Sequence, residues 1–533
     1  MPNALPTRAR ATNLPDALRE LDAYPHFVDA VEVIETHISW VFLAGDYAYK
    51  VKKPLRLPFL DYSTLARREH FCREELRINR RTAPDLYLDV VPIAGSPPRV
   101  RGDGPVVDWA VRMRRFPQAA LLDALATSRG LQPWHVDAFA THVARFHAVA
   151  ERAGTDTPYG SADTVAATAA ANFDEIAALG VPPGQEARLA ALRAWTAAES
   201  AALADRFASR KAAGCVRECH GDLHLGNAFL AGAAVRLFDA VEFDPALRWT
   251  DTMDDVAFAY MDFIAHGLPR MAYRFLDGYL ERSGDFDGLA TLRYYAVYRA
   301  LVRCKVACVR HASAVDEFAR HEAGLKAERY LVLASRLAQR EPPVLVLMHG
   351  PSASGKTVGS QRLLEALGAV RLRSDVERKR LHGIDPMTHA FAPPGEGLYG
   401  RAQDDATYAR LIALARGVLA AGFPVVVDAA FLDRVRREPF AALAHETGAA
   451  FEILSCRAPA DVLRGRIERR MMKGDDASDA GLDVLERQLA GFESLATDEH
   501  VHATVLDTTS PAAWAGAIES FARRFRLPMD EAA

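Results

Sequence analysis

The chain has 533 residues, half hydrophobic and a quarter charged, so its length allows about three or four compact units of ordinary globular protein. Its formal net charge of −4 is small for this length and gives no electrostatic case for nucleic acid or a membrane as partner. The N-terminal stretch MPNALPTRARATNLPDAL lacks an apolar signal core, and no run is apolar enough for a membrane span.

The six cysteines make no C-x-x-C pair. Cys304 and Cys308 stand one helical turn apart in an apolar segment, which indicates core packing. Cys215 and Cys219 precede His220, an order that could suggest zinc, but no fourth ligand follows nearby. This cysteine usage, without an export signal, predicts a reducing, cytoplasmic location.

Residues 1–30 form a segment punctuated by prolines, and the next segment alternates as β-strands do. The run VEVIETHISWVFLAGDYAYKVKK breaks at Gly45-Asp46, which predicts an antiparallel hairpin. Its second strand ends in three closely spaced lysines: Lys50, Lys52 and Lys53. Either this is a solvated strand end, or one of these lysines reaches a phosphate.

A charged, helical pattern at residues 65–81 carries three glutamates, Glu69, Glu74 and Glu75. Two strand-like runs, 86–93 and 108–116, follow and are separated by a turn rich in proline and glycine. Strands, one helix and further strands predict a small mixed lobe over residues 31–116.

Residues 117–338 change to Ala-rich helical patterns, interrupted by one polar segment punctuated by glycines. There His220-Gly221-Asp222 is followed by Asn227, and an apolar strand ends at Asp239. The spacing suits phosphoryl transfer, in which Asp222 would take the proton of the attacking hydroxyl while Asn227 and Asp239 hold Mg²⁺. Each residue alone could be a turn former or a helix cap. The order of strand lysine, helix glutamate, H-G-D-x-x-x-x-N and final aspartate favours the catalytic interpretation.

Residues from about 30 to 330 resemble the aminoglycoside phosphotransferase and fructosamine-kinase family, small-molecule relatives of protein kinases, through HGDLHLGN and FDAVEFDP. The resemblance implies that Asp222 is the catalytic base and that Asn227 and Asp239 are metal ligands. It matches Lys50, in the pattern YKV, to the phosphate-binding lysine, with Glu75 as its preferred partner and Glu69 as the fallback.

By the same resemblance, Met113 to Phe116 fall where the family's hinge contacts adenine, and Asp255 in DDVAF matches its structural aspartate. The chain departs from the pattern at THISWVFLAG, which has no G-x-G-x-x-G over the phosphates. A short linker at residues 339–343 contains Pro342-Pro343, and its stiffness predicts that the domains on either side touch.

The apolar run at residues 344–349 leads into GPSASGKT, which matches G-x-x-x-x-G-K-[ST] and is followed by helical spacing. In this motif backbone N–H groups surround a phosphate, the lysine reaches the outer phosphates and the hydroxyl holds Mg²⁺. The predicted ATP-binding residues are Gly350, Ser352, Ser354, Gly355, Lys356 and Thr357, the last also a metal ligand.

Strand and helix patterns alternate through residues 344–533, which predicts a parallel sheet with ligands at the C-terminal strand ends. Asp375 and Asp428 lie at such ends. We expect Asp375 to deprotonate an acceptor hydroxyl, unless it is a helix cap, and Asp428 to position Mg²⁺ or substrate. On a later helix, Arg466 and Arg469 are expected to neutralise the transferred phosphoryl group, although a solvated helix face explains some of its arginines equally well.

This second part resembles the small P-loop kinases, a group that includes gluconate kinase, polynucleotide 5′-kinase and zeta-type kinases. The residues that carry the resemblance are GPSASGKT, RSDVERKRL, VVVDAAFLDR and CRAPADVLRGRIERR. Likeness to the polynucleotide-kinase type implies that Asp375 is the acceptor base and that Arg434 or Arg437 contacts substrate.

The predicted fold is an α+β protein-kinase-like bilobal domain followed by an α/β P-loop domain with a mainly parallel sheet. The predicted function is bifunctional, with two sites that each use ATP and Mg²⁺ to phosphorylate a hydroxyl of a sugar-like or aminoglycoside-like small molecule. One alternative is a domain that binds ATP without turnover and regulates the other, because the Gly-rich loop is missing. A kinase acting on nucleic-acid ends is the other, disfavoured by the near-neutral charge and the lack of a basic stripe.

Overall fold

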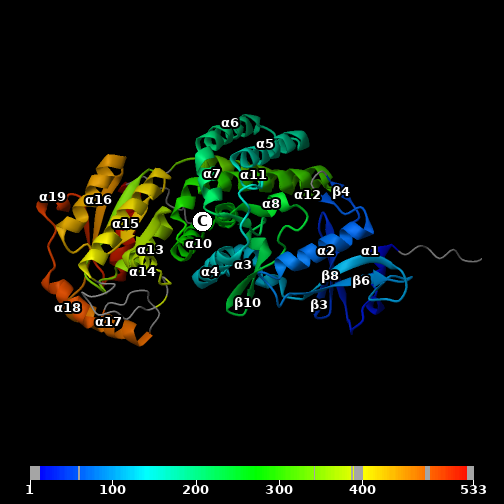
Figure 1. Ribbon diagram of the computed structural model, residues 1–533, viewed down its shortest axis with the longest axis horizontal. Coiled ribbons are helices and arrows are strands. Elements are labelled where there is room, and N and C mark those ends of the chain that lie inside the picture. The colour runs from blue at the N-terminus through cyan, green and yellow to red at the C-terminus, as the bar shows by residue number, and fades with distance from the viewer. Residues whose placement is uncertain are drawn as a thin grey trace, which may run out of the picture. The chain divides into compact units, whose positions relative to one another are not determined.

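A computed structural model describes residues 13–57, 60–340, 342–385, 388, 400–473 and 481–524. The chain divides into two compact units, and Figure 1 labels its helices and strands in chain order. The first unit comprises Met1–Leu131, Val149–Ala153 and Val216–Thr250. The second comprises Gln132–Ala148, Gly154–Cys215 and Asp251–Ala533. Each unit is described separately below.

The first unit is built on an antiparallel sheet with the strand order β1-β2-β3-β8-β6-β7. Its strands are β1 (Val31–Glu35), β2 (Ser39–Ala44), β3 (Tyr47–Lys52), β6 (Tyr87–Ala94), β7 (Arg99–Val100) and β8 (Val106–Arg114). The hairpin predicted at Gly45-Asp46 is confirmed, since Ala44 pairs with Tyr47 across that turn. The run before the turn is two strands rather than one, because a turn at Thr36 closes onto Ser39.

Helix α2 (Leu65–Asn79) packs against β6 and β8, as Figure 1 shows. Alternation along the strands gives the sheet two apolar faces, so that Phe42 and Tyr49 belong to one core while Leu43 and Ala48 belong to the core that contains Cys72 of α2. The face that carries Ala48 therefore also carries Lys50 and Lys52.

Shorter elements complete the first unit and position its polar segment. They are α1 (Leu14–Ala17), η1 (Leu21–Ala23), β4 (Arg56–Leu57), β5 (Leu60–Asp61), η2 (Gln118–Ala120), α3 (Leu122–Thr127), β9 (Val216–Glu218), η3 (Leu225–Asn227), β10 (Ala228–Ala231), β11 (Ala234–Leu237) and α8 (Pro245–Arg248). Strand β12 (Trp249–Asp251) runs from this unit into the second. The hairpin β10-β11 turns at Gly232, as its sequence suggested.

The first part of the second unit is helical. Its helices are α4 (Pro133–Val149), α5 (Ala162–Leu179), α6 (Glu186–Ala202), α7 (Ala204–Ala212), α9 (Thr252–Ala265), α10 (Pro269–Ser283), η4 (Phe286–Gly288), α11 (Leu289–Ser313) and α12 (Glu317–Leu337). Helix α11 lies at its centre and packs against α5, α9 and α12. Cys304 and Cys308 are buried on α11, as expected of core residues.

The second part of this unit is a five-stranded parallel sheet with the order β14-β15-β13-β16-β17, which confirms the predicted α/β P-loop fold. Its strands are β13 (Val344–His349), β14 (Val370–Arg373), β15 (Val425–Asp428), β16 (Ala450–Arg457) and β17 (Ala503–Asp507). Its helices are α13 (Lys356–Leu367), α14 (Ser374–Leu381), α15 (Arg401–Ala420), α16 (Arg434–Thr447), α17 (Ala460–Lys473), α18 (Leu482–Ala490), α19 (Thr497–His500) and α20 (Pro511–Arg524). Helices α13 and α20 share one core with β13, and α15 packs against α16.

The helical part and the P-loop part of the second unit touch, as their stiff connection predicted. Helix α10 packs against α13 and β14. The contact contains buried charges, with Arg371 Nη2 lying 2.6 Å from Asp277 Oδ2 and Arg373 Nη1 lying 3.1 Å from Glu281 Oε1.

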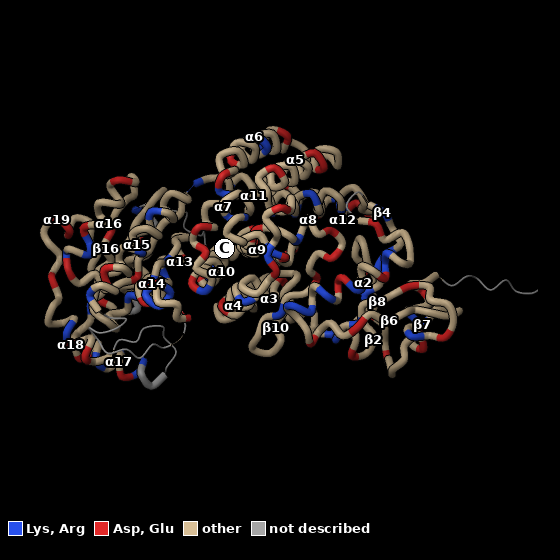
Figure 2. Tube along the Cα trace, viewed as in Figure 1, with Lys and Arg blue, Asp and Glu red and all other residues tan. Residues whose placement is uncertain are grey.

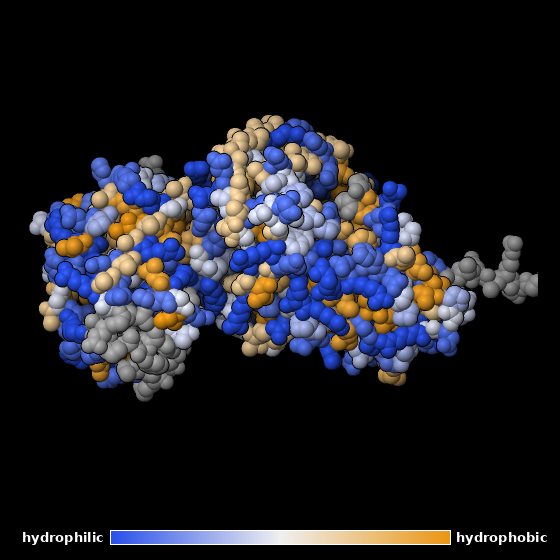
Figure 3. Space-filling view, viewed as in Figure 1, coloured by the Kyte–Doolittle hydropathy of each residue, from blue (hydrophilic) through white to orange (hydrophobic). Residues whose placement is uncertain are grey.

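Charges of both signs are interspersed along the chain, as Figure 2 shows, and Figure 3 shows hydrophobic residues scattered over the visible face. Among the described residues, no helix combines the length and apolarity needed to cross a bilayer.

Candidate active sites

The first candidate site begins with a lysine of β3 and a glutamate of α2. Lys50 Nζ donates to Glu75 Oε1 at 2.8 Å and also pairs with Asp239. The other two glutamates of α2 face different partners, because Glu69 pairs with Arg73 and Glu74 with Arg77. The structure thus brings Lys50 together with Glu75, the preferred partner, and not with Glu69.

The charges around Lys50 hold its ammonium in the protonated form. Burial alone would lower the pKa of Lys50, but the carboxylates of Asp239 and Glu75 outweigh it and raise this pKa well above its ordinary value. A permanently charged ammonium suits a phosphate ligand.

The H-G-D segment follows β9 and depends on its glycine. Gly221 has φ +81°, and a Cβ there would lie 2.7 Å from the carbonyl oxygen of Leu247. Asp222 follows with its side chain 38% exposed, and its Oδ2 accepts from Asn227 Nδ2 at 2.9 Å. The Asp222 carboxylate is therefore both held in place and reachable.

Asn227 and Asp239 meet through the hairpin β10-β11. The N–H of Phe238 donates to the carbonyl of Asn227 at 3.0 Å, and Asp239 is the next residue. Asp239 adopts φ +63°, a conformation that aspartate tolerates, and its N–H donates to Tyr87 Oη at 3.0 Å. Its carboxylate is 43% exposed.

These two side chains fit Mg²⁺ by their chemistry. Asn227 uses its amide nitrogen toward Asp222, so its amide oxygen is the atom that would act as a metal ligand. An amide oxygen and a partly exposed carboxylate are the oxygen ligands that Mg²⁺ prefers.

Met113 lies on β8 opposite Ala48 of β3 and is 7% exposed. It belongs to the apolar cluster that includes Phe229, against which Phe116 and Phe238 pack. The rings of Phe116 and Phe229 stack with their centroids 4.1 Å apart. Met113 thus contributes to an apolar surface beside Lys50, while the β1–β2 connection, Thr36 to Ile38, contains no glycine.

The second candidate site is the loop between β13 and α13. Gly350 has φ +140°, and a Cβ there would lie 2.5 Å from the carbonyl oxygen of Cys456. Gly355, at φ +95°, is the N-cap of α13, so the loop leads directly to a helix N-terminus, where anions bind. The loop thus has the backbone form that its sequence predicted.

Side chains of this loop face its interior. Lys356 Nζ donates to the carbonyl of Pro351 at 2.7 Å. Removal from water lowers the pKa of Lys356, and this effect outweighs the carboxylates of Asp428 and Asp375, which raise it. Ser354 Oγ is buried and finds no hydrogen-bond partner within the described residues. The Ser352 N–H donates to Gln488 Oε1 of α18 at 2.7 Å. A partly buried cation and an unsatisfied hydroxyl fit a phosphate group.

Asp428 ends β15 and stands beside the first turn of α13, which carries Thr357. Ser360 Oγ donates to Asp428 Oδ2 at 3.0 Å and to the carbonyl of Thr357 at 3.1 Å. A hydroxyl such as that of Thr357 and a carboxylate such as that of Asp428 are oxygen groups of the kind that Mg²⁺ prefers.

Asp375 lies at the same edge of the sheet, since Arg373 at the end of β14 pairs with Asp428. Arg373 is the N-cap of α14, and Asp375 is in the first turn, so Asp375 is not the cap. Arg378 bridges two carboxylates, with Nη1 3.2 Å from Asp375 Oδ1 and Nη2 2.6 Å from Asp404 Oδ1.

The arginines expected at the second site differ in their surroundings. Arg466 donates to the carbonyl of Ala353 at 3.1 Å and to the carbonyl of Thr508 at 2.8 Å, so it braces the P-loop. Arg469 is exposed.

The two arginines expected to contact substrate are Arg434 and Arg437. Arg437 is buried, pairs with Glu499 and donates to the Phe431 carbonyl. Arg434 pairs with Asp498. Arg437 is therefore a structural residue, not a substrate contact.

Several residues around these sites were not singled out from the sequence. Besides Gln488 and Ser360, they include Tyr62, Tyr87 and Glu242. Lys52 was named only as one of three lysines at the strand end, although the period of two along β3 places it on the same face as Lys50.

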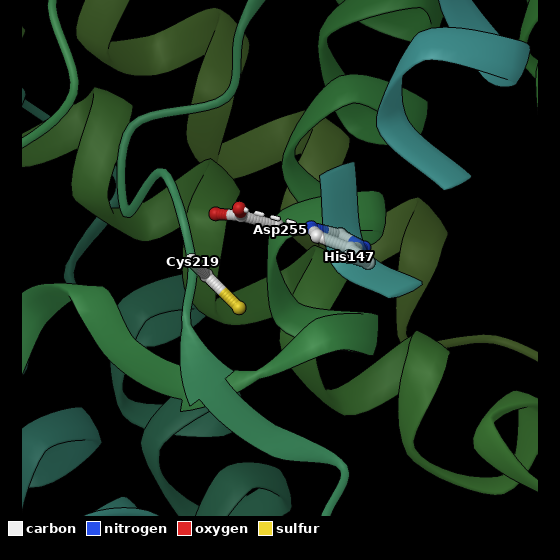
Figure 4. A group of neighbouring side chains, drawn as sticks. All are labelled: His147, Cys219 and Asp255. Carbon is white, nitrogen blue, oxygen red and sulfur yellow. Dashed lines mark hydrogen bonds and ion pairs between the residues drawn. The ribbon is translucent and has the colours of Figure 1, made fainter. Parts of the chain in front are cut away.

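Asp255, the expected structural aspartate, is buried on α9. Figure 4 shows it facing His147, whose Nε2 lies 3.3 Å from Asp255 Oδ2. His147 Nδ1 lies 3.1 Å from Tyr279 Oη. These contacts join α4, α9 and α10 within the second unit and indicate a structural role.

The fold joins a protein-kinase-like region, with its antiparallel sheet, helix α2 and H-G-D segment, to a P-loop domain with a parallel sheet. A family profile described as an AAA domain matches residues 345–495. The chain is 32% identical over 450 residues to "Uncharacterized protein Rv2004c" of Mycobacterium tuberculosis (strain ATCC 25618 / H37Rv), a match covering 84% of this chain and 88% of that protein. "Uncharacterized protein Mb2027c" of Mycobacterium bovis matches equally. The chain belongs to the family of these mycobacterial proteins.

Solved structures also show similarity to this chain. A gluconokinase from Sinorhizobium meliloti 1021 is 21% identical, covers 35% of this chain and 99% of its own, and has a TM-score of 0.24. A choline/ethanolamine kinase family protein from Mesorhizobium loti is 12% identical, covers 61% of this chain and 100% of its own, and has a TM-score of 0.36.

Proposed function

We propose that the chain is a bifunctional kinase that moves the γ-phosphoryl group of ATP to hydroxyl groups of small molecules at two separate sites. The observation that carries the proposal is that Lys50 pairs with both Glu75 and Asp239. The hydrogen-bonded Asp222 and Asn227 lie close to this group. The same chain also has a complete P-loop. The proposed domain bounds remain 31–116 and 117–338 for the two kinase lobes and 344–533 for the P-loop domain.

At the first site, Lys50 would bind the α- and β-phosphates, and Glu75 would hold Lys50 in that position. Asp222 would accept the proton of the acceptor hydroxyl, with its carboxylate oriented by the amide of Asn227. The apolar cluster of Met113, Phe116 and Phe229 offers a surface for the adenine ring. Mg²⁺, when bound by Asn227 and Asp239, would neutralise phosphate charge.

At the second site, the loop from Gly350 to Thr357 would surround the phosphates, with Lys356 at the outer ones. Asp375 would deprotonate the acceptor hydroxyl, and Arg378 would fix its position. Asp428 and Thr357 would hold Mg²⁺. Arg466 would support the loop, and Arg469 has the exposed position from which it could meet the nucleotide.

The acceptors we propose are small hydroxyl compounds of the cytoplasm, in line with the sugar kinase and choline kinase titles among the matched structures. A second candidate function is that the first unit binds ATP without turnover and regulates the P-loop domain. The observation that favours it is the β1–β2 connection without glycine. Nucleic-acid ends are disfavoured because charges of both signs are interspersed along the chain.

The test compares wild type, Asp222→Ala and Lys356→Ala with a metabolite extract as acceptor pool and mass spectrometry of the products. We expect each variant to lose a different phosphorylated product by at least about a hundredfold. Asp174→Ala and Arg416→Ala, which remove exposed ion pairs, serve as controls. If Asp222→Ala leaves every product intact while Lys356→Ala abolishes all, the regulatory function replaces the bifunctional one.

A further inference from the structure

Two lysines of β3 share a single carboxylate of α2. Lys50 Nζ donates to Glu75 Oε1 and Lys52 Nζ donates to Glu75 Oε2, both at 2.8 Å. Glu75 is fully buried. Burial alone would raise the pKa of Glu75, but the two ammonium groups lower it, so the carboxylate stays ionised between them.

Lys52 differs from Lys50 in its second carboxylate partner. Its side chain is 0% exposed and, besides Glu75, it pairs with Glu242, which also accepts from the hydroxyl of Tyr62. Lys50 instead pairs with Asp239, whose carboxylate is 43% exposed. Only Lys50 is therefore in a position to meet a phosphate.

The contacts form a continuous series in which charges alternate: Asp239, Lys50, Glu75, Lys52 and Glu242. The series joins β3, α2 and the segment after β11. A further contact joins the same elements, since the Ala240 N–H donates to Asn79 Oδ1 at 2.9 Å, and Asn79 is the last residue of α2.

We propose that Lys52, together with Glu242, is a positioning pair that sets the orientation of Glu75 and through it the place of Lys50 at the triphosphate. A glutamate with one bound oxygen can still rotate about its side-chain bonds, whereas Glu75, held at both oxygens, presents Oε1 to Lys50 in one geometry. The proposal rests on the proposed function of the first site, where Lys50 binds phosphate. It gives the first unit a fixed lysine although the β1–β2 connection, Thr36 to Ile38, contains no glycine.

The test measures binding of Mg²⁺-ATP in a Lys356→Ala background, in which the P-loop no longer binds ATP tightly, by titration with a fluorescent ATP analogue. Lys52→Met breaks the series and leaves Glu242 without its cation, so it should lower both the melting temperature and the ATP affinity. Lys52→Met/Glu242→Gln removes one charge of each sign and keeps an acceptor for Tyr62. We expect this double variant to regain most of the melting temperature while its ATP affinity stays about tenfold weaker than in the background chain.

Recovery of affinity together with the melting temperature in the double variant would overturn the proposal, because Lys52 would then only support the fold. Tyr62→Phe is a milder variant that retains the ring, and we expect an affinity loss of about threefold. An unchanged affinity in Tyr62→Phe would also count against the proposal. Lys50→Met separates the two hypotheses: if it leaves ATP binding intact, the proposed first site itself is wrong, whatever Lys52 does.

Discussion

At the scale of single residues, the P-loop depends on backbone conformations that few side chains tolerate. Gly350 has φ +140° and packs so closely that a Cβ would lie 2.5 Å from the Cys456 carbonyl oxygen and 2.7 Å from Ser354 Oγ. By contrast, Gly417 lies within α15, and a Cβ there would meet nothing within 4 Å. The two glycines therefore have opposite expectations on substitution.

We predict that Gly350→Ala weakens ATP binding at the P-loop by roughly tenfold or more, because the loop must distort to admit the methyl group. Gly417→Ala should instead stabilise the protein by about 0.5–1 kcal/mol, since alanine is favoured over glycine in a helix. ATP titration in a Lys50→Met background and urea unfolding measure the two effects. Equal ATP affinity of Gly350→Ala and the background chain would show that the loop binds differently from what we propose.

The sequence predicted the residues of the P-loop because its chemistry is local, with Gly350 and Lys356 six positions apart. It did not predict the partners of Lys52. Glu242 lies 190 residues further along the chain, and no spacing rule joins a strand residue to so distant a carboxylate. Only the assembled sheet and helix bring them together.

At the scale of elements, a buried glutamate ties the H-G-D segment to the end of α2. Glu218 ends β9 and is surrounded by three arginines, Arg77, Arg81 and Arg248. Burial opposes its ionisation, but hydrogen bonds and charges from the arginines outweigh it and lower the pKa of Glu218 to about 2. The ion pairs thus hold β9 and α2 together next to Asp222.

We predict that Glu218→Gln destabilises the first unit by roughly 2–3 kcal/mol at pH 7. Because the folded-state pKa lies below the ordinary value of 4.5, this contribution is fully present above about pH 4.5 and is lost as the pH falls toward 2. Urea unfolding of both proteins at pH 7, 5 and 3 should show a difference that shrinks with acid. Glu446→Gln, at an exposed pair with Arg416, is the control and should show no such difference. A difference that stayed constant down to pH 3 would contradict the assignment.

Periodicity predicted the elements wherever one pattern dominated. The apolar run of β13 and the alternation of β3 predict these strands, whereas the sequence does not separate β1 from β2, because a three-residue turn without glycine leaves no composition signal. Helix α15 received no prediction. Its apolar residues form a narrow stripe, with Leu411, Ala415 and Val418 buried among many small and charged neighbours.

At the scale of the whole molecule, the second unit joins a helical part to a P-loop part through charges rather than apolar packing alone. Arg371 and Arg373 of β14 meet Asp277 and Glu281 of α10. Burial alone would lower the pKa of Arg371, but the two carboxylates raise it above its ordinary value. The sequence predicted that these parts touch but could not name the pairs, which lie about 90 residues apart.

We predict that Arg371→Met separates the stability of the two parts of the second unit. The variant leaves Asp277 and Glu281 buried with fewer cations beside them. Removing one partner of a buried ion pair lowers the free energy of unfolding by about 3–5 kcal/mol. Because β14 is the edge strand beside β15, the P-loop part should unfold at a lower temperature than the rest, and calorimetry should resolve an earlier transition.

Two further variants decide whether the buried pair is the cause. Asp277→Leu/Arg371→Met removes both charges and should regain most of the lost transition temperature, since replacing a whole buried pair by apolar side chains is near neutral. Arg416→Ala, at an exposed pair in the same P-loop part, should leave the transition almost unchanged. If the single and double Arg371 variants melt alike, the loss of packing by the arginine stem explains the effect, and the charges across this contact do not hold the two parts together.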